Sequence, residues 1–250
     1  MWRKENNKFQ GVKIRVEKTT DSVDQQIQKI ISMVPLDEMT YVKFFGGEPL
    51  FTDTHLKLLR QLPNPQNVTV HYTTNGSILP NQSVLDLWSK FKTVIFAASL
   101  DGVNEQFDYV RWPLSWKKVS RNLVRLQQYK LHNLMFRVEF TANLLNVFYY
   151  DKLENWVRKN WHSNLFGDET EINIHSASHS AFNLSDMPAS LRLRIQEKYP
   201  STHRLHLMVK NLQNVPDLTK FTAFVDRWDP VRGISWQSCF PDLISDICSK

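Results

Sequence analysis

Cysteine is scarce in this chain, and its scarcity excludes two kinds of stabilising site. The 250 residues contain two cysteines, Cys239 and Cys248, nine positions apart near the end of the sequence. Two cysteines are too few for a disulfide framework, and their spacing does not match a tetrahedral metal site. We therefore expect ordinary thiols and predict no metal site made by this chain.

Long apolar runs are absent as well. No segment approaches the roughly 20 apolar residues that span a bilayer, and the start MWRKENNKF has no apolar stretch typical of a secretory signal. We expect a cytoplasmic protein without membrane contact. Glycine is also sparse, with 7 residues, and no polar low-complexity tract occurs, whereas 42% of the residues are hydrophobic. This composition is typical of a folded globule.

The excess of positive charge predicts little about partners. The net charge is +6, but Lys and Arg are spread along the chain and alternate with Asp and Glu. Such a pattern favours a solvated surface, and no RNP aromatic pair or Cys/His finger occurs. Nucleic acid is therefore not the favoured partner, and a basic nucleic-acid or structural partner protein is a third hypothesis that rests on charge alone.

Apolar, β-branched runs alternate with segments of helical period. Because these runs are nearly continuously apolar, we expect a parallel sheet of βα units whose strands are buried on both faces. The predicted strands cover residues 12–16, 40–45, 67–74, 93–100, 134–142 and 171–175. The predicted helices between them cover 22–34, 53–62, 82–91, 115–131 and 149–161.

The strand pattern stops after about residue 176. The remaining chain has helical period over 188–199, 203–213 and 217–228 and ends in a polar, aromatic tail. The stretch 176–187, SASHSAFNLSDM, has the composition of a connecting loop. We therefore predict an α/β core over residues 1–176 and a helical C-terminal extension over residues 177–250.

Polar and glycine-rich turns follow three successive predicted strands, where α/β proteins place their functional groups. The first is Gly46-Gly47-Glu48-Pro49, in which the glycines free the backbone to approach a ligand and a carboxylate stands ready for an ammonium group. The second is Asn75-Gly76, and the third is Asp101-Gly102 after Ser99. A single such turn is usually structural, so the prediction of a site depends on three in order.

The segments KFFGGEPL, YTTNGS and SLDGVNEQFDYVRWPLSWKKVSRNLVRL together resemble the radical S-adenosylmethionine (SAM) superfamily. The similarity is closest to members with a SPASM or Twitch type C-terminal extension. It covers residues 40–130 well and the remainder loosely. The resemblance implies a partial (β/α) barrel of the radical SAM type with a small helical C-terminal extension.

The resemblance also implies cofactor-binding roles for particular residues. Gly46, Gly47 and Glu48 stand where the family binds the amino group of SAM, and Pro49 shapes that turn. Ser99 and Arg111 stand where it holds the carboxylate and ribose, which suits a guanidinium. A set of three more residues either lines the pocket or only shapes turns, and both roles stay open: Asn75, Asp101 and Asn146.

The sequence departs from the family at its defining motif. The CxxxCxxC loop, which ligates a 4Fe-4S cluster, is absent, and no cysteine precedes Cys239. We expect either a truncated chain or a degenerate paralogue, and the intact SAM-facing residues favour truncation. Cys239 and Cys248 are alternatively ligands of an auxiliary cluster completed elsewhere. A metal site at His175 and His179 is not predicted, because their spacing requires a helix that the pattern does not support.

Two main functional hypotheses follow from the resemblance. The parent enzyme would cleave SAM reductively at the cluster and use the 5′-deoxyadenosyl radical to abstract hydrogen, with a peptide or protein as a candidate substrate and an electron donor as a partner. Alternatively, the chain is a cluster-free module that binds SAM or a peptide without catalysis. The sequence identifies no catalytic residue and no substrate.

Overall fold

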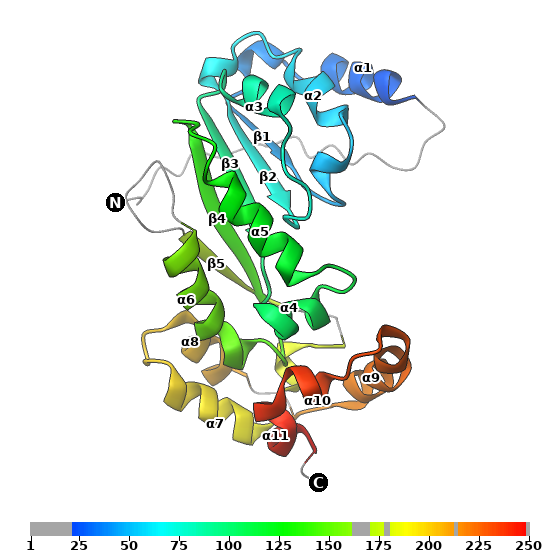
Figure 1. Ribbon diagram of the computed structural model, residues 1–250, viewed down its shortest axis with the longest axis vertical. Coiled ribbons are helices and arrows are strands. Elements are labelled where there is room, and N and C mark those ends of the chain that lie inside the picture. The colour runs from blue at the N-terminus through cyan, green and yellow to red at the C-terminus, as the bar shows by residue number, and fades with distance from the viewer. Residues whose placement is uncertain (1–21, 162–170, 178–180, 213–214, 249–250) are drawn as a thin grey trace.

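A five-stranded parallel sheet forms the centre of the protein (Figure 1). The computed structural model describes residues 22–161, 171–177, 181–212 and 215–248. The strands are β1 (Tyr41–Phe44), β2 (Thr69–Thr74), β3 (Thr93–Ser99), β4 (Leu134–Ala142) and β5 (Glu171–Ser176). Each lies at a range predicted from its apolar pattern, which confirms the α/β class with a parallel sheet. The further strand predicted at residues 12–16 lies outside the described residues.

Helices connect the strands as the helical period predicts. They are α1 (Val23–Met33), α2 (Thr54–Leu59), α3 (Gln82–Trp88), α4 (Asn104–Val110), α5 (Trp116–Leu126) and α6 (Tyr150–Asn160). Ser22 and Gln25 form a capping box at the start of α1, and Asn81 caps α3 by accepting a hydrogen bond from the Val84 amide. Only α4 among them was not predicted; it is short and has no capping side chain.

The remaining helices follow β5. They are α7 (Ala189–Lys198), α8 (Arg204–Lys210), α9 (Thr219–Arg232), α10 (Trp236–Cys239) and α11 (Ile244–Cys248). The first three match predicted ranges, whereas α10 and α11 occupy the segment expected to be an irregular tail. Short 3₁₀ turns are η1 (Leu36–Glu38), η2 (Pro49–Phe51), η3 (Pro65–Asn67), η4 (Val147–Tyr149), η5 (Leu184–Asp186) and η6 (Pro241–Leu243). Within the described ranges, no helix has both the length and the apolar character needed to cross a membrane.

The strands are ordered β1-β2-β3-β4-β5, so each pairs with its neighbour in the chain. Right-handed crossovers between such strands place all the connecting helices on one face, whereas a doubly wound sheet reverses its order and covers both faces. Side-chain contacts agree. Tyr72 and Phe96 contact Trp88 at the end of α3, and Phe140 packs on Tyr150 of α6. These contacts place α3 and α6 on the same face of the sheet.

That helix-covered face forms the core. Phe96 and Phe136 both contact Trp161, with ring centroids 6.4 and 4.9 Å apart, and all three side chains are fully buried. Tyr72 accepts a hydrogen bond from the Trp88 indole at 3.2 Å, which satisfies the donor inside the core. Aromatic side chains therefore fill the space between the sheet and its helices.

We call the opposite face of the sheet the open face. The expectation that every strand is buried on both faces is wrong, because this face is partly exposed. Most residues of β2 and β3 are buried, whereas side chains of β4 alternate between buried and half-buried, and β5 has a single buried residue. The half-buried positions of β4 include Arg137 and Glu139. Polar side chains on the open face interrupt the apolar runs at a period of two, which is the period of a strand with one covered face.

The helices after residue 181 pack against the core through aromatic contacts. Tyr150 contacts Tyr199, and Phe240 contacts both Tyr109 and Tyr149, with ring centroids 5.5 to 6.2 Å apart. One continuous cluster of buried apolar residues includes members of β2 to β5 and of α7 to α10. The division into a core over 1–176 and an extension over 177–250 stays a prediction.

Candidate functional site

The carboxyl ends of the parallel strands lie along one edge of the sheet, which we call the rim, and bring the predicted turns to it. The Gly46-Gly47-Glu48 turn follows β1, Asn75-Gly76 follows β2, and Asp101-Gly102 follows β3. The rim therefore presents three turns from neighbouring strands, as the order of the motifs predicts.

Glu48 connects the first turn to the second through hydrogen bonds. Its carboxylate accepts hydrogen bonds from the Thr74 hydroxyl at 2.8 and 2.9 Å and from the Asn75 amide at 2.9 Å. It also accepts the Leu50 amide at 3.2 Å and thereby caps η2, which Pro49 opens. Glu48 as a whole residue is half-buried, and both of its carboxylate oxygens accept hydrogen bonds from within the chain. A ligand ammonium group would interact with the same negatively charged carboxylate that accepts these internal hydrogen bonds.

The two glycines of this turn differ in their need for glycine. Gly46 has a φ of 121°, which other residues rarely adopt, so the backbone itself requires glycine there. Gly47 has no such φ, and a Cβ atom at Gly47 would meet nothing within 4 Å. Within the described residues, neither the backbone nor packing requires glycine at position 47, and the open space beside it fits the close approach of a ligand.

The third turn is braced by Asp101, Arg111 and Asn146. Asp101 accepts a hydrogen bond from the Thr141 amide at 2.8 Å, and its other carboxylate oxygen lies 2.7 Å from Arg111 Nε, forming an ion pair without a directed hydrogen bond. Asn146 donates to the backbone carbonyls of Asp101 and Thr141 at 3.1 and 3.0 Å. Asp101 and Asn146 thus join the ends of β3 and β4, and Asp101 positions Arg111.

Asn75 and Ser99 occupy different positions on the rim. The Asn75 side chain accepts a hydrogen bond from the Ser77 amide at 2.9 Å, which is an Asx turn. Ser99 ends β3 on the open face, opposite Glu139 in the register. The rim residues form two hydrogen-bonded groups, one around Glu48 and one around Asp101, and within the described residues no contact joins Glu48 to Arg111.

A second polar group lies on the open face and was missed by the sequence analysis. His71 is 3% exposed, and its Nδ1 atom lies 2.5 Å from the Tyr41 hydroxyl. Burial, followed by the positive charges of Lys43 and Arg137, lowers the pKa of His71 to about 4. The imidazole is therefore neutral at pH 7.

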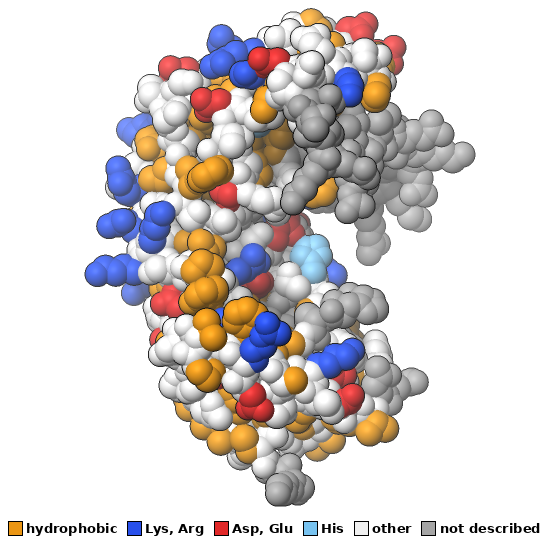
Figure 2. All heavy atoms as spheres, turned by 90° about the vertical axis from the view of Figure 1, so that its right-hand side faces the viewer, with side chains coloured by type: hydrophobic (Ala, Val, Ile, Leu, Met, Phe, Trp, Pro, Cys, Tyr) orange, Lys and Arg blue, Asp and Glu red, His pale blue; other side chains and the backbone are white. Residues whose placement is uncertain are grey.

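Further along the open face, Glu139 of β4 contacts two side chains of β5. It accepts a hydrogen bond from Asn173 at 3.1 Å, and its second oxygen lies 2.6 Å from His175 Nε2. An imidazole oriented by a carboxylate is an arrangement suited to proton transfer. Figure 2 shows that the molecule is hollowed at mid-height on the side viewed there, with acidic, basic and histidine side chains at the hollow.

A signal for these residues exists in the sequence. In LMFRVEFTA, Arg137 and Glu139 fall two apart among apolar neighbours, and in EINIH the residues Asn173 and His175 do the same. Because successive side chains of a strand point to opposite faces, this spacing places each pair on one face. His175 lies on a strand, as the pattern predicted, and His179 lies outside the described residues.

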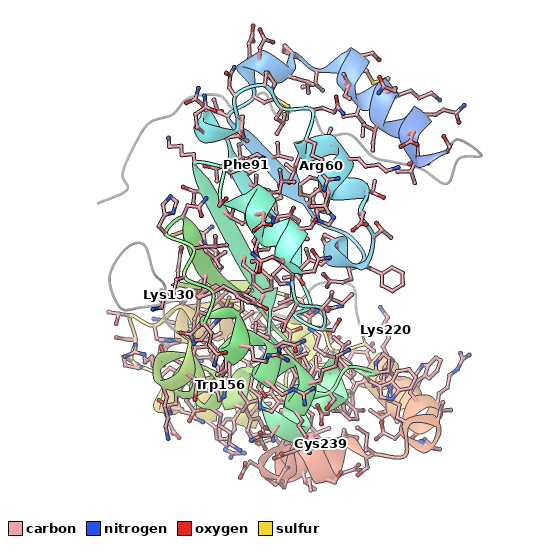
Figure 3. The ribbon with its side chains drawn as sticks, turned by 45° about the horizontal axis from the view of Figure 1, so that its top comes forward. Arg60, Phe91, Lys130, Trp156, Lys220 and Cys239 are labelled. Carbon is pink, nitrogen blue, oxygen red and sulfur yellow. The ribbon has the colours of Figure 1, made fainter. Side chains whose placement is uncertain are left out.

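The two cysteines lie away from the rim and the open face. Cys239 of α10 is buried at the end of the molecule opposite to Arg60 and Phe91 (Figure 3), and burial raises the pKa of its thiol. Cys248 is exposed on α11. In the portion of the chain that the structure describes, no group of three His, Cys, Asp or Glu side chains is placed to bind a metal ion.

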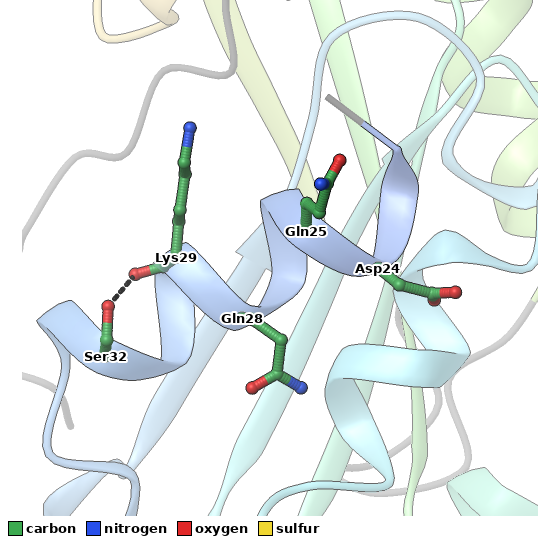
Figure 4. A pocket seen from close by; sticks show the side chains of 5 residues that line it. All are labelled: Asp24, Gln25, Gln28, Lys29 and Ser32. Atoms are coloured by element: carbon green, nitrogen blue, oxygen red, sulfur yellow. Dashed lines mark hydrogen bonds between the residues drawn. The ribbon is translucent and has the colours of Figure 1, made fainter. Parts of the chain in front are cut away.

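A shallow depression on α1 offers no comparable chemistry. It is lined by side chains of one helix and is open to solvent (Figure 4): Asp24, Gln25, Gln28, Lys29 and Ser32. Its Ser32 hydroxyl donates to the Lys29 carbonyl of the same helix. Depressions of this kind are ordinary features of an exposed helix face, so the rim and the open face remain the candidate site.

Comparison with known proteins does not assign the chain to a family. No family model matches the chain, and no curated protein matches it. The functional assignment therefore depends on the rim motifs and on the geometry that surrounds them.

Proposed function

We propose that this chain is a (β/α) protein of the radical SAM type that binds SAM at the rim. The observation that carries the proposal is Gly47, an exposed position where glycine is not needed by the backbone or by packing, beside the anchored carboxylate of Glu48. A small, charged ligand with an amino group would explain both features. The strands in chain order support the barrel type.

The residues present fit the polar groups of SAM. The Glu48 carboxylate would bind the ammonium group, while Arg111, positioned by Asp101, would bind the SAM carboxylate through its remaining guanidinium hydrogens. Ser99 at the end of β3 would contact the ribose or carboxylate. SAM bound in this way supplies a sulfonium centre and, in the family, the precursor of a radical.

The residues of the chain can also be compared with the ligands that the iron–sulfur cluster requires, and here the result is different. A 4Fe-4S cluster requires thiolate ligands, and the whole sequence has two cysteines, one of them buried on α10. Neither follows a strand of the sheet. The residues of this chain therefore do not fit the cluster, and the proposed function of the chain is SAM binding. Hydrogen abstraction from a peptide or protein, as the resemblance implies, would require ligands from elsewhere.

Isothermal titration of the full chain with SAM tests the proposal. We expect saturable binding that weakens at least tenfold in Gly47→Val, whose added methyl groups occupy the open space without disturbing the turn, and in Arg111→Gln. Arg125→Gln, on the exposed surface of α5, is the matched control and is expected to leave binding unchanged. A folded chain that gives no heat with SAM would contradict the proposal.

Reconstitution with iron and sulfide under anaerobic conditions tests the cluster. We expect no 4Fe-4S absorption and no 5′-deoxyadenosine from this chain, while SAM binding persists. Formation of 5′-deoxyadenosine by the reconstituted chain would instead show that it binds a cluster through other ligands.

A further inference from the structure

The outer side of α5 has a different charge pattern from most of the chain. From residue 109 to residue 138 the sequence contains no Asp or Glu, whereas acids are interspersed with cations in most other stretches. Within this range α5 has four exposed cations, which we call the basic stripe: Lys117, Lys118, Arg121 and Arg125. Figure 2 shows Lys and Arg side chains gathered along its left edge at the height of α5, on the side that faces the viewer in Figure 1.

The inner side of α5 holds the helix against the core. Leu123 is buried, and the Asn122 side chain donates a hydrogen bond to the Gly76 carbonyl at 3.0 Å. Trp116, at the start of the helix, packs against Trp156 of α6 with ring centroids 4.8 Å apart. These contacts fix which side of α5 faces solvent, and the basic stripe lies on that side.

The basic stripe has no acidic partner within the described ranges. None of its four residues forms an ion pair there. By contrast, Arg158 of α6 pairs with Glu154 at 3.3 Å. A cation without a partner in its own chain can pair with an acid of another molecule without the loss of an internal ion pair. The stripe is therefore available to a second molecule.

The neighbouring helices do not cancel the charge of α5. One acid and no cation occur in α3, two acids and no cation in α4, and two acids and three cations in α6, which gives a net charge of −2 against +4 on α5. Each of these acids accepts a hydrogen bond or forms an ion pair within the chain: Asp86, Glu105, Asp108, Asp151 and Glu154. The electrostatic potential outside α5 is therefore positive.

The spacing of the basic stripe matches the carboxylates of an acidic helix. Lys117, Arg121 and Arg125 follow one another at intervals of four residues, which is about 6 Å along the helix axis. Glutamates at the same interval in a partner helix repeat at the same distance, so each carboxylate can reach one cation. Val124 lies on the same side of α5, is 40% exposed and offers an apolar contact to such a partner.

A nucleic acid fits this surface less well. The phosphates of a duplex are about 3.4 Å apart along each strand, roughly half the interval of the basic stripe. A duplex is also wider than one helix, so some of its phosphates would lie over the acids of α4 and α6. A partner as narrow as one peptide segment avoids these acids.

We propose that the basic stripe of α5 is a docking surface for an acidic helical segment of a partner protein, with carboxylates at intervals of four residues. The stripe lies on the outer side of the helical layer rather than at the rim, so this interaction is separate from SAM binding and goes beyond the proposed function. Because the charges are exposed, binding weakens as the salt concentration rises.

Fluorescence anisotropy of the full chain with a labelled helical peptide of four Glu-Ala-Ala-Ala repeats tests the proposal. We expect saturable binding at low salt. The triple variant Lys117→Gln, Arg121→Gln and Arg125→Gln is expected to raise the peptide dissociation constant about tenfold, since each exposed ion pair contributes a factor of roughly two to three.

A second triple variant on α6 is the matched control: Lys152→Gln, Arg158→Gln and Lys159→Gln. All three residues are exposed, and their replacement changes the net charge of the chain by the same amount. We expect this variant to bind the peptide as the parent does, because the attraction comes from the stripe and not from the overall charge.

Two further ligands test the spacing and the class of the partner. One is a peptide of the same composition whose four glutamates are contiguous, and the other is an oligothymidylate of the same length. We expect both to bind more weakly than the repeat peptide. The proposal is overturned if the folded chain shows no saturable binding of the repeat peptide, if the α6 variant loses as much affinity as the α5 variant, or if either further ligand binds as tightly as the repeat peptide. None of these outcomes depends on whether SAM binds at the rim.

Discussion

Thr73 and Thr74 are neighbours in β2, yet their hydroxyl groups have opposite surroundings because successive side chains of a strand point to opposite faces. The Thr74 hydroxyl donates to Glu48 and accepts the Gly76 amide at 3.1 Å. The Thr73 hydroxyl is buried and has no hydrogen-bond partner among the residues that the structure describes. The same residue type therefore stabilises the rim at one position and has no internal partner at the next.

Replacing each threonine by valine measures this difference. Thr73→Val removes an unsatisfied hydroxyl without changing shape, and we expect the free energy of unfolding to rise by about 1 kcal/mol. Thr74→Val leaves Glu48 and the Gly76 amide with fewer partners, and we expect a loss of about 2 kcal/mol. Urea unfolding of both variants gives the comparison, and a destabilised Thr73→Val would show that its hydroxyl has a partner in solution.

His71 makes stability depend on pH. Its pKa is about 4 in the folded chain and about 6.5 when unfolded. Between these values the unfolded chain binds the proton and the folded chain does not. The free energy of unfolding therefore falls by about 3 kcal/mol as pH decreases from 6.5 to 4, and is unaffected above that range.

The variant His71→Leu isolates this dependence. Burial also lowers the pKa of His55 and of His203. Both histidines are present in the parent and in the variant, so their effects on the pH dependence of stability cancel in the comparison. We expect the difference in unfolding free energy between the two proteins to vary with pH only below about 6.5. Urea unfolding at several pH values measures it, and a constant difference between pH 7 and 4 would contradict the assigned pKa.

At the scale of elements, the rim consists of turns whose side chains form hydrogen bonds with the neighbouring strand of the sheet. Glu48 joins β1 to β2, and Asp101 joins β3 to β4. Each carboxylate satisfies a backbone amide at a strand end that has no partner in the sheet ladder. These hydrogen bonds hold the rim turns together within the chain itself, and such preorganisation would lower the entropy cost of binding the proposed ligand.

The two glycines of the turn after β1 are expected to differ in how much a side chain destabilises the fold. Gly46→Ala forces a side chain into a φ of 121°, and we expect it to lower the free energy of unfolding by about 2 kcal/mol. Gly47→Ala meets no neighbour and is expected to leave stability within about 0.5 kcal/mol of the parent. Thermal unfolding measures both, and equal losses would indicate that the turn differs from this conformation.

The junction of α4 with α9 depends on one carboxylate. Asp229 accepts hydrogen bonds from the Tyr109 hydroxyl at 2.6 Å and from the Trp236 amide at 2.8 Å. Asp229→Ala leaves the buried Tyr109 hydroxyl without its partner, and we expect a loss of about 2 kcal/mol. Asp226→Ala, on the exposed side of the same helix, is the control. Similar urea midpoints for the two variants would contradict this role.

At the scale of the whole molecule, the buried apolar cluster is continuous from the sheet to the C-terminal helices. Tyr109, Tyr149 and Tyr150 of the segments after β3 and β4 are covered by Phe240 and Tyr199. Removing the C-terminal helices would expose these large side chains to water.

We therefore expect the chain to unfold in one cooperative transition. Near-ultraviolet and far-ultraviolet circular dichroism are expected to give the same urea midpoint. The slowest amide hydrogens of α7 to α9, which exchange only when the whole chain unfolds, are expected to exchange no faster than those of β2 to β4. Separate transitions would instead support independent units with a boundary near residue 176.

The order of the five strands and the approximate bounds of the longer helices could be predicted from sequence patterns alone. The apolar runs and helical periods that flank the turns predicted β1 to β5 and most helices, because local pattern sets which stretches can bury a face. The short α4, α10 and α11 were missed because their few turns are formed by packing against other parts of the chain rather than by a periodic pattern.

Which face of the sheet is open, and which side chains lie on it, depends on how the folded chain packs. The polar residues Arg137 and Glu139 are separated by 34 or more positions from His175 and His71, and the register between strands brings them onto one face. The rim residues could be predicted from turn motifs, since glycine and carboxylates mark strand ends locally. The polar contacts of the open face could not be predicted, because burial and hydrogen-bond partners are properties of the packed chain.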